Sequence, residues 1–207
     1  METNLFHVLQ RGDHKQQVFF EEDDYQAYID MLAPLCSETN IRIWAYLMMP
    51  NHVHLVLATD TPVELRKTIG RANCLYRRRI NFRKGLDQRL WQDQMLIFSL
   101  RKDEQLLTAA ARYIELEPVG EGLAAAAEDY PWSSARAHLA GRDDGLVAVE
   151  PLLSLVPDWE KFLLEGGTCA FAKRFRSQER KVGMFQRLHF AKIISRMTGR
   201  RSSFRPA

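Results

Sequence analysis

Residues 41–58 constrain the fold more than any other segment, because they contain two extended stretches separated by Pro50-Asn51. The stretches are rich in β-branched and aromatic residues, and proline followed by asparagine is a strong turn former. They therefore predict two strands, 41–49 and 52–58, joined as a hairpin. His52 and His54 stand two residues apart in the second strand, so their side chains point to the same face of the sheet.

The flanking segments complete a recognisable order of elements. We expect a strand over residues 6–10, an amphipathic helix over 21–38, a helix beginning at Pro62 and ending near residue 82, and a strand over 90–100. The sum is a ferredoxin-like βαββαβ sheet of the α+β class. A third helix is expected over 103–117 and should end before Pro118. We place a catalytic domain in residues 1–140, and a linker with a basic helical extension in 141–207.

Composition limits the class of protein. The chain has 207 residues, of which 46% are hydrophobic, as expected for a globular protein. No apolar run reaches the ~20 residues that span a bilayer, so no membrane partner is expected. Three scattered cysteines form no CxxC pair, which favours the reducing cytoplasm.

The charge distribution favours a nucleic-acid partner. The net charge is only +3, but residues 66–84 contain eight lysines and arginines and no acidic residue. Residues 173–205 contain eleven basic residues and one acidic residue, Glu179. Clustered positive charge on an otherwise acidic body is typical of proteins that bind DNA or RNA.

The third expected helix adds groups with chemical potential. Tyr113 and Glu117 are four residues apart, so they share one face of a helix. His52, His54 and Glu117 would together offer two imidazole nitrogens and a carboxylate to a divalent metal ion. A phenol beside that ion could attack a phosphate that the metal polarises.

Six collinear stretches make the chain resemble a single-tyrosine HUH transposase, of the insertion-sequence type and its REP-associated relatives. They are Phe6-His-Val-Leu-Gln-Arg-Gly12, Met49-Pro-Asn-His-Val-His-Leu-Val56, Tyr76-Arg-Arg-Arg-Ile-Asn-Phe82, Leu90-Trp-Gln92, Ala111-Arg-Tyr-Ile-Glu-Leu-Glu-Pro-Val119 and Tyr130-Pro-Trp-Ser-Ser134.

The resemblance implies a metal-dependent transposase that cleaves and rejoins single-stranded or hairpin DNA through a 5′-phosphotyrosine. It makes Tyr113 the catalytic nucleophile. It also implies that His52, His54 and Glu117 bind Mg²⁺ or Mn²⁺, with Glu117 in the place of the family's asparagine. The candidate DNA contacts are six arginines: Arg11, Arg66, Arg71, Arg77, Arg78 and Arg79.

Several alternatives stay open at this point. Tyr76 is a rival nucleophile, although it has no metal ligand three or four residues further on. The family usually continues Trp-Gln with Gly-Arg-Phe, whereas this chain has Asp93-Gln94-Met95, so a relative that binds hairpin DNA without cutting it is the second hypothesis. Two histidines and a carboxylate also occur in iron oxygenases, which have no use for a basic helix. A homodimer is possible, and His7 either lines the site or is a core residue.

Overall fold

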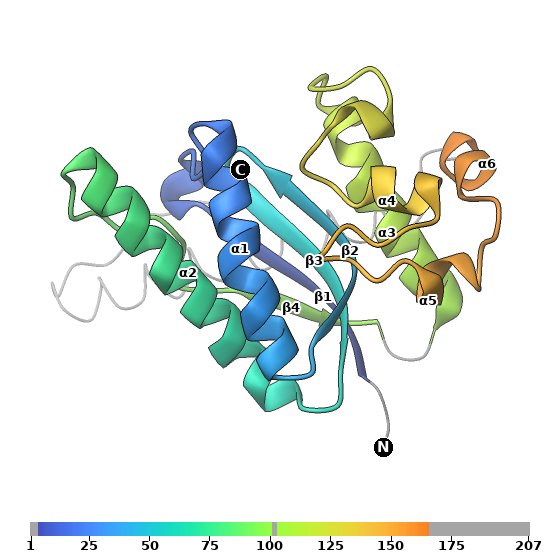
Figure 1. The fold of residues 1–207 in the computed structure, drawn as a ribbon, viewed down its shortest axis with the longest axis horizontal. Helices are drawn as coiled ribbons and strands as arrows, with labels where there is room; N and C mark the ends of the chain where they lie inside the picture. The colour runs from blue at the N-terminus through green and yellow to red at the C-terminus, as the bar shows by residue number, and fades with distance from the viewer. Residues whose placement is uncertain (1–3, 101–102, 166–207) are drawn as a thin grey trace, which may run out of the picture. The chain divides into compact units, whose positions relative to one another are not determined.

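The computed structural model describes residues 4–100 and 103–165 of the chain. Figure 1 shows a sheet with helices on both of its faces. The strands and longer helices of the first half are β1 Asn4–Arg11, α1 Glu22–Glu38, β2 Arg42–Met49, β3 His52–Thr59, α2 Pro62–Lys84 and β4 Leu96–Ser99. They are followed by α3 Glu104–Gly120, α4 Ala135–Ala140, α5 Glu150–Leu153 and α6 Trp159–Leu164.

The sheet confirms the predicted α+β, ferredoxin-like order. Its four strands are arranged β2-β3-β1-β4, and every neighbouring pair is antiparallel. Helices α1 and α2 pack against each other on one face, while α3 covers the opposite face at β2 and β3 (Figure 1). The element order β-α-β-β-α-β is the one expected from the sequence.

The pleat of β3 separates the main core from the histidines. Val53, Leu55 and Leu57 are buried in the core that α1 and α2 close. Residues opposite one another across an antiparallel ladder share a face, and the partners of His54 are Leu9 and Leu47. His52 and His54 therefore face the other way, toward α3.

Two elements differ from the sequence prediction. Strand β4 has four residues rather than eleven, because Trp91 makes only an isolated bridge to Gly12 and its ring packs into the aromatic core. Helix α3 continues through Pro118 to Gly120. A proline in the last turn removes only one backbone hydrogen bond, and the helix ends two residues later.

The division at residue 140 stays a prediction. Helix α6, which follows that position, contacts α3 and α4. The basic segment 173–205, predicted as a helical extension, lies outside the described residues. Among the helices of residues 4–100 and 103–165, none has the length and apolarity required to cross a membrane.

Candidate metal centre and tyrosine helix

The β2–β3 turn is held in place by the loop that follows β1. The backbone N–H of Gly12 donates to the carbonyl of Asn51 at 2.8 Å, and Val18 N–H donates to Pro50 at 2.7 Å. A Cβ atom at Gly12 would lie 2.2 Å from the carbonyl oxygen of Gln16, so only glycine allows this approach. The loop therefore fixes the residue that immediately precedes His52.

Helix α3 directs Tyr113 and Glu117 to one side and Glu115 to the other. Its first turn is capped by Asp103, whose carboxylate accepts from Leu106 N–H at 3.0 Å. Tyr113 and Glu117 lie on the face that meets β3, as their four-residue spacing requires. Glu115 lies between them in sequence and therefore points to the opposite side of the helix.

His52, His54 and Glu117 converge between β3 and α3. The Nε2 atom of His52 lies 3.4 Å from one Glu117 carboxylate oxygen, and His54 Nε2 lies 3.2 Å from the other. One ligand atom from each side chain falls within 4.8 Å of the other two. Ligand atoms about 2.1 Å from one ion and 90–109° apart are separated by about 3.0–3.4 Å, and both histidine–carboxylate distances lie in this range.

The other ring nitrogens of the two histidines already have partners. His52 Nδ1 donates to the side-chain oxygen of Asn51 at 2.7 Å, and His54 Nδ1 lies 2.8 Å from Nε2 of His7. A histidine that donates from Nδ1 presents its Nε2 lone pair to the site. A divalent cation between these two Nε2 atoms and the Glu117 carboxylate would be bound by all three side chains.

The protonation of these groups suits metal binding. Burial lowers the pKa of His52 by more than the nearby Glu117 carboxylate raises it, so the imidazole is neutral at pH 7. Burial lowers the pKa of His7 well below its usual value, and His54 lowers it further. Burial opposes ionisation of Glu117, but His54 and His52 outweigh it and hold the pKa of that carboxyl below its usual range.

The two candidate tyrosines lie in different places. The ring of Tyr113 stands perpendicular to His54, with 6.2 Å between ring centroids, and it is half-buried beside the candidate metal ligands. Tyr76 is fully buried in the core under α1, and its hydroxyl donates to the carbonyl of Val18 at 2.7 Å. Only Tyr113 accompanies the histidine pair.

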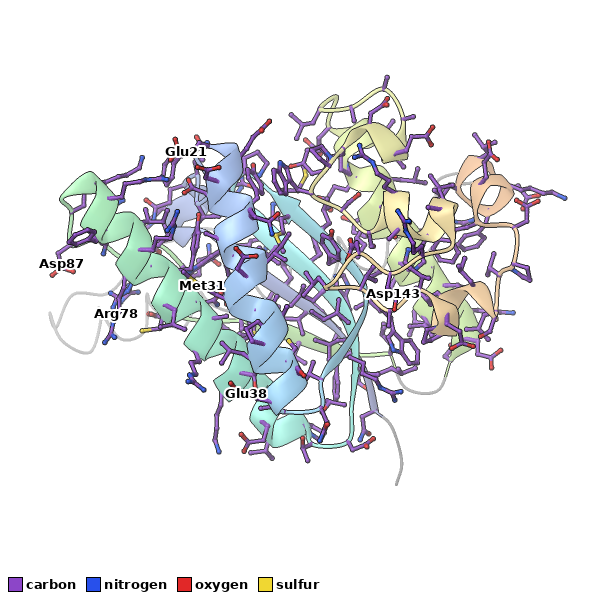
Figure 2. All side chains as sticks on the ribbon, viewed as in Figure 1. Glu21, Met31, Glu38, Arg78, Asp87 and Asp143 are labelled. Carbon is purple, nitrogen blue, oxygen red and sulfur yellow. The ribbon has the colours of Figure 1, made fainter. Side chains whose placement is uncertain are left out.

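The candidate DNA-binding arginines fall into two groups. Arg11 pairs with His52 across the β1–β3 ladder and so lies on the same face of the sheet as the histidines. The other five are on α2, which covers the opposite face, and Figure 2 shows Arg78 on the side of α2 that points away from the sheet. Arg66 donates to the carbonyl of Met95 at 3.3 Å, and Arg71 pairs with Glu38.

A buried hydrogen-bond network around Glu115 was not anticipated from the sequence. Its carboxylate accepts from Ser134 Oγ at 2.6 Å, His138 Nδ1 at 2.7 Å and Trp159 Nε1 at 2.8 Å. All four side chains are buried, and Ser134 also accepts from the backbone N–H of Tyr46 in β2. The network therefore ties α3 to the sheet edge, α4 and α6. A polar residue on the face of α3 opposite Tyr113 was the one available signal.

The departure at residues 93–95 lies next to β1. The backbone N–H of Gln92 donates to the carbonyl of Arg11 at 2.9 Å. Arg11 is paired with His52, so the stretch begins at the same end of the sheet as His52. Asp93 forms an exposed ion pair with Arg89 at 2.6 Å. That cation offsets part of the negative charge that Asp93 would present to DNA.

Comparisons with known proteins identify one sequence family and two solved structures that are similar to this chain. The sequence model of a family described as IS200-like transposase matches residues 2–117. A solved structure of a REP-associated tyrosine transposase bound to a REP hairpin is 20% identical, covers 70% of this chain and 84% of its own, and superposes with a TM-score of 0.51. A Deinococcus radiodurans structure described as a candidate transposase is 16% identical and covers 56% of this chain and 91% of its own, with a TM-score of 0.41. Comparison with curated proteins gives no match.

Proposed function

Since the chain belongs to the IS200-like transposase family, we propose that it is a DNA transposase that uses Tyr113 and a divalent metal to cleave and rejoin single-stranded DNA. The observation that carries the proposal is the meeting of His52, His54 and Glu117 beside Tyr113 in one chain. Family membership supports the reaction class, and the proximity of these four side chains supports a metal-assisted attack by tyrosine.

The chain's own residues divide the work among them. His52, His54 and Glu117 would hold Mg²⁺ or Mn²⁺, which would act as a Lewis acid on the scissile phosphoryl oxygen. Two neutral imidazoles leave the ion most of its positive charge, and the Glu117 carboxylate supplies the oxygen ligand that such hard cations prefer. Tyr113 stands beside His54 and would supply the attacking oxygen.

In the cleavage step the Tyr113 oxygen forms a bond to phosphorus and loses its proton to solvent. The bond from phosphorus to the 3′ oxygen breaks, and that oxygen takes up a proton as a free 3′-hydroxyl. The product is a 5′-phosphotyrosyl ester, which keeps the energy of the broken bond. A second 3′-hydroxyl can then attack the ester and reseal the strand without a nucleotide cofactor.

The DNA contacts of the proposal follow the two groups of arginines. Arg11, beside His52, is the candidate for the phosphate next to the scissile bond. The α2 arginines lie on the far side of the sheet, so they would contact a more distant part of the DNA backbone, which positions the nucleic acid without reading its sequence. The structural relative binds a hairpin, and we extend hairpin recognition to this chain as part of the proposal.

The test is the capture of the covalent intermediate. The protein is incubated with Mn²⁺ and single-stranded hairpin DNA from its own genomic flanks, labelled at either the 3′ or the 5′ end. A 5′-phosphotyrosine predicts that the 3′ label migrates with the protein under denaturing conditions. The 5′ label should appear on a shorter free strand.

Two matched variants sharpen the result. Tyr113→Phe should form no adduct, while Tyr76→Phe should form it, because Tyr76 serves the core. The opposite pattern would overturn the assignment of the nucleophile. Hairpin binding that is specific, independent of Tyr113 and never followed by an adduct would favour the non-cutting relative.

The proposal needs no second copy of the chain, because one chain supplies all four side chains. Some members of the family exchange the tyrosine helix between subunits. Mixing Tyr113→Phe with His52→Gln would restore adduct formation only if two copies share α3. We expect no restoration.

A further inference from the structure

The feature that goes beyond this assignment is His7, which is completely buried in β1 and bonded to a metal ligand. Its Nε2 atom lies 2.8 Å from Nδ1 of His54, although the two residues are 47 positions apart. The β1–β3 register pairs His7 with Val56, which is two residues after His54 and therefore the next residue on the same face of the sheet. The ladder of the sheet therefore sets this contact.

Two proton arrangements are possible for this pair of imidazoles. If His54 donates from Nδ1, its Nε2 atom presents a lone pair toward Glu117 and can bind a metal ion. If His7 donates instead, the proton of His54 sits on Nε2, where it faces the Glu117 carboxylate at 3.2 Å and blocks coordination. A cation on His54 Nε2 would require the first arrangement, in which His7 Nε2 is the acceptor.

We infer that His7 is a positioning residue, whose Nε2 accepts the Nδ1–H of His54 and so holds the tautomer in which His54 Nε2 faces the metal. Asn51 holds His52 in the corresponding tautomer, because its side-chain oxygen accepts the Nδ1–H of His52 at 2.7 Å. Each histidine ligand thus has its own acceptor behind it. Such partners fix both the orientation and the basicity of a ligand. The inference rests on the proposed metal centre.

The surroundings of His7 keep this bond directional. Its ring packs 6.1 Å from the ring of Phe98 in β4, between centroids, and 5.0 Å from that of His54. No solvent reaches the side chain, so an apolar side chain that fills the same space leaves little room for a water molecule to replace the acceptor. A buried donor left unpaired is costly, and His54 would avoid that cost by moving its proton to Nε2.

The experiment measures metal affinity instead of DNA cleavage. Mn²⁺ binding is followed by electron paramagnetic resonance in the wild type and in His7→Gln, whose amide oxygen can replace the Nε2 acceptor. The same measurement is made in His7→Phe, which keeps a ring and removes the acceptor, and in His7→Leu, in case the phenylalanine is not accommodated. We expect His7→Gln to bind within about threefold of the wild type, and both apolar variants to bind about 10- to 100-fold more weakly.

Tyr28→Phe is the matched control for destabilisation. It removes a buried hydrogen bond, from the Tyr28 hydroxyl to Asn73 at 2.8 Å, on the α1–α2 side of the sheet. It should lower the thermal midpoint and leave Mn²⁺ affinity unchanged. A direct readout is the ¹⁵N spectrum of the Zn²⁺-loaded protein, in which His54 Nδ1 should be the protonated nitrogen.

The possible failures are distinguishable. Wild-type affinity in His7→Phe or His7→Leu, or equal losses in His7→Gln and the apolar variants, would overturn the role of His7 alone. A protonated Nε2 on His54 in the Zn²⁺ form would do the same. A wild-type protein that binds neither Mn²⁺ nor Zn²⁺ would instead refute the metal centre of the proposed function.

Discussion

Replacing Glu115 by glutamine tests whether the network behind α3 holds the tyrosine helix. The carboxylate accepts three hydrogen bonds, of 2.6, 2.7 and 2.8 Å, in a place that solvent does not reach. An amide offers one acceptor oxygen and one NH₂ group, so at least one of the three donors loses its partner. The least costly orientation keeps the oxygen on Ser134 and His138 and leaves the indole N–H of Trp159 unpaired.

The magnitude follows from that geometry. A hydrogen bond to a charged group contributes about 1.5–3 kcal/mol, and a buried unpaired donor costs about 1–3 kcal/mol. We therefore expect Glu115→Gln to lower the free energy of unfolding by about 2–4 kcal/mol. Glu117→Gln, two residues further along α3, should also lower it in the metal-free protein, because a carboxyl whose pKa is held below its usual range stabilises the fold when it is ionised.

Urea unfolding followed by far-ultraviolet circular dichroism measures both variants, and Ser134→Ala completes a double-mutant cycle with Glu115→Gln. Groups in one buried network couple by about 0.5–3 kcal/mol. A loss below about 1 kcal/mol with an unchanged dependence on urea would refute the reasoning. Additive effects of Ser134→Ala and Glu115→Gln would refute it as well.

Three further outcomes are expected. The pKa values of His7 and His52 are lowered in the folded protein, so below about pH 6.5 the unfolded chain binds more protons than the folded one. The free energy of unfolding, measured in urea, should therefore fall from pH 7 to 5.5 by up to about 1.4 kcal/mol per pH unit for each histidine. The fall should be shallower in His52→Gln. Saturating Mn²⁺, at about 100 times its dissociation constant, should add about 2.7 kcal/mol to the stability of the wild type, an increase that chelation reverses and Glu117→Ala abolishes in a calorimetric melt. Gly12→Ala should lower the thermal midpoint through a cost of about 1–3 kcal/mol, since its Cβ would meet the Gln16 carbonyl; an unchanged melt would argue against the loop geometry.

The fold could be predicted because local patterns and turn chemistry agreed along most of the chain. The Pro50-Asn51 turn and the flanking apolar alternation gave the hairpin, and the four-residue spacing placed Tyr113 and Glu117 on one helix face. Strand β4 was predicted too long, because the apolar residues that suggested a strand, Trp91 above all, serve the aromatic core. Pro118 was expected to stop α3, but a proline in a final turn has little left to interrupt.

The parts of the site that depend on distant pairing could not be predicted. The contact of His7 with His54 follows from strand register, and the bonds of Glu115 join residues 19, 23 and 44 positions away. No periodicity within a short window carries such information. Likewise, the run of basic residues predicted a charged helix face, but only the topology puts α2 on the side of the sheet away from the histidines.

The network at Glu115 also bears on the order of events during synthesis. The matched family stretch ends at residue 117, yet the last donor to Glu115 is Trp159, about 40 residues later. At ~5–20 residues per second, ribosomal synthesis supplies that residue roughly 2–8 s after α3 is complete. Until then one oxygen of the Glu115 carboxylate lacks its hydrogen-bond donor, which disfavours burial of that side of α3. We therefore expect a delay between the synthesis of Tyr113 and the docking of α3 against the histidines.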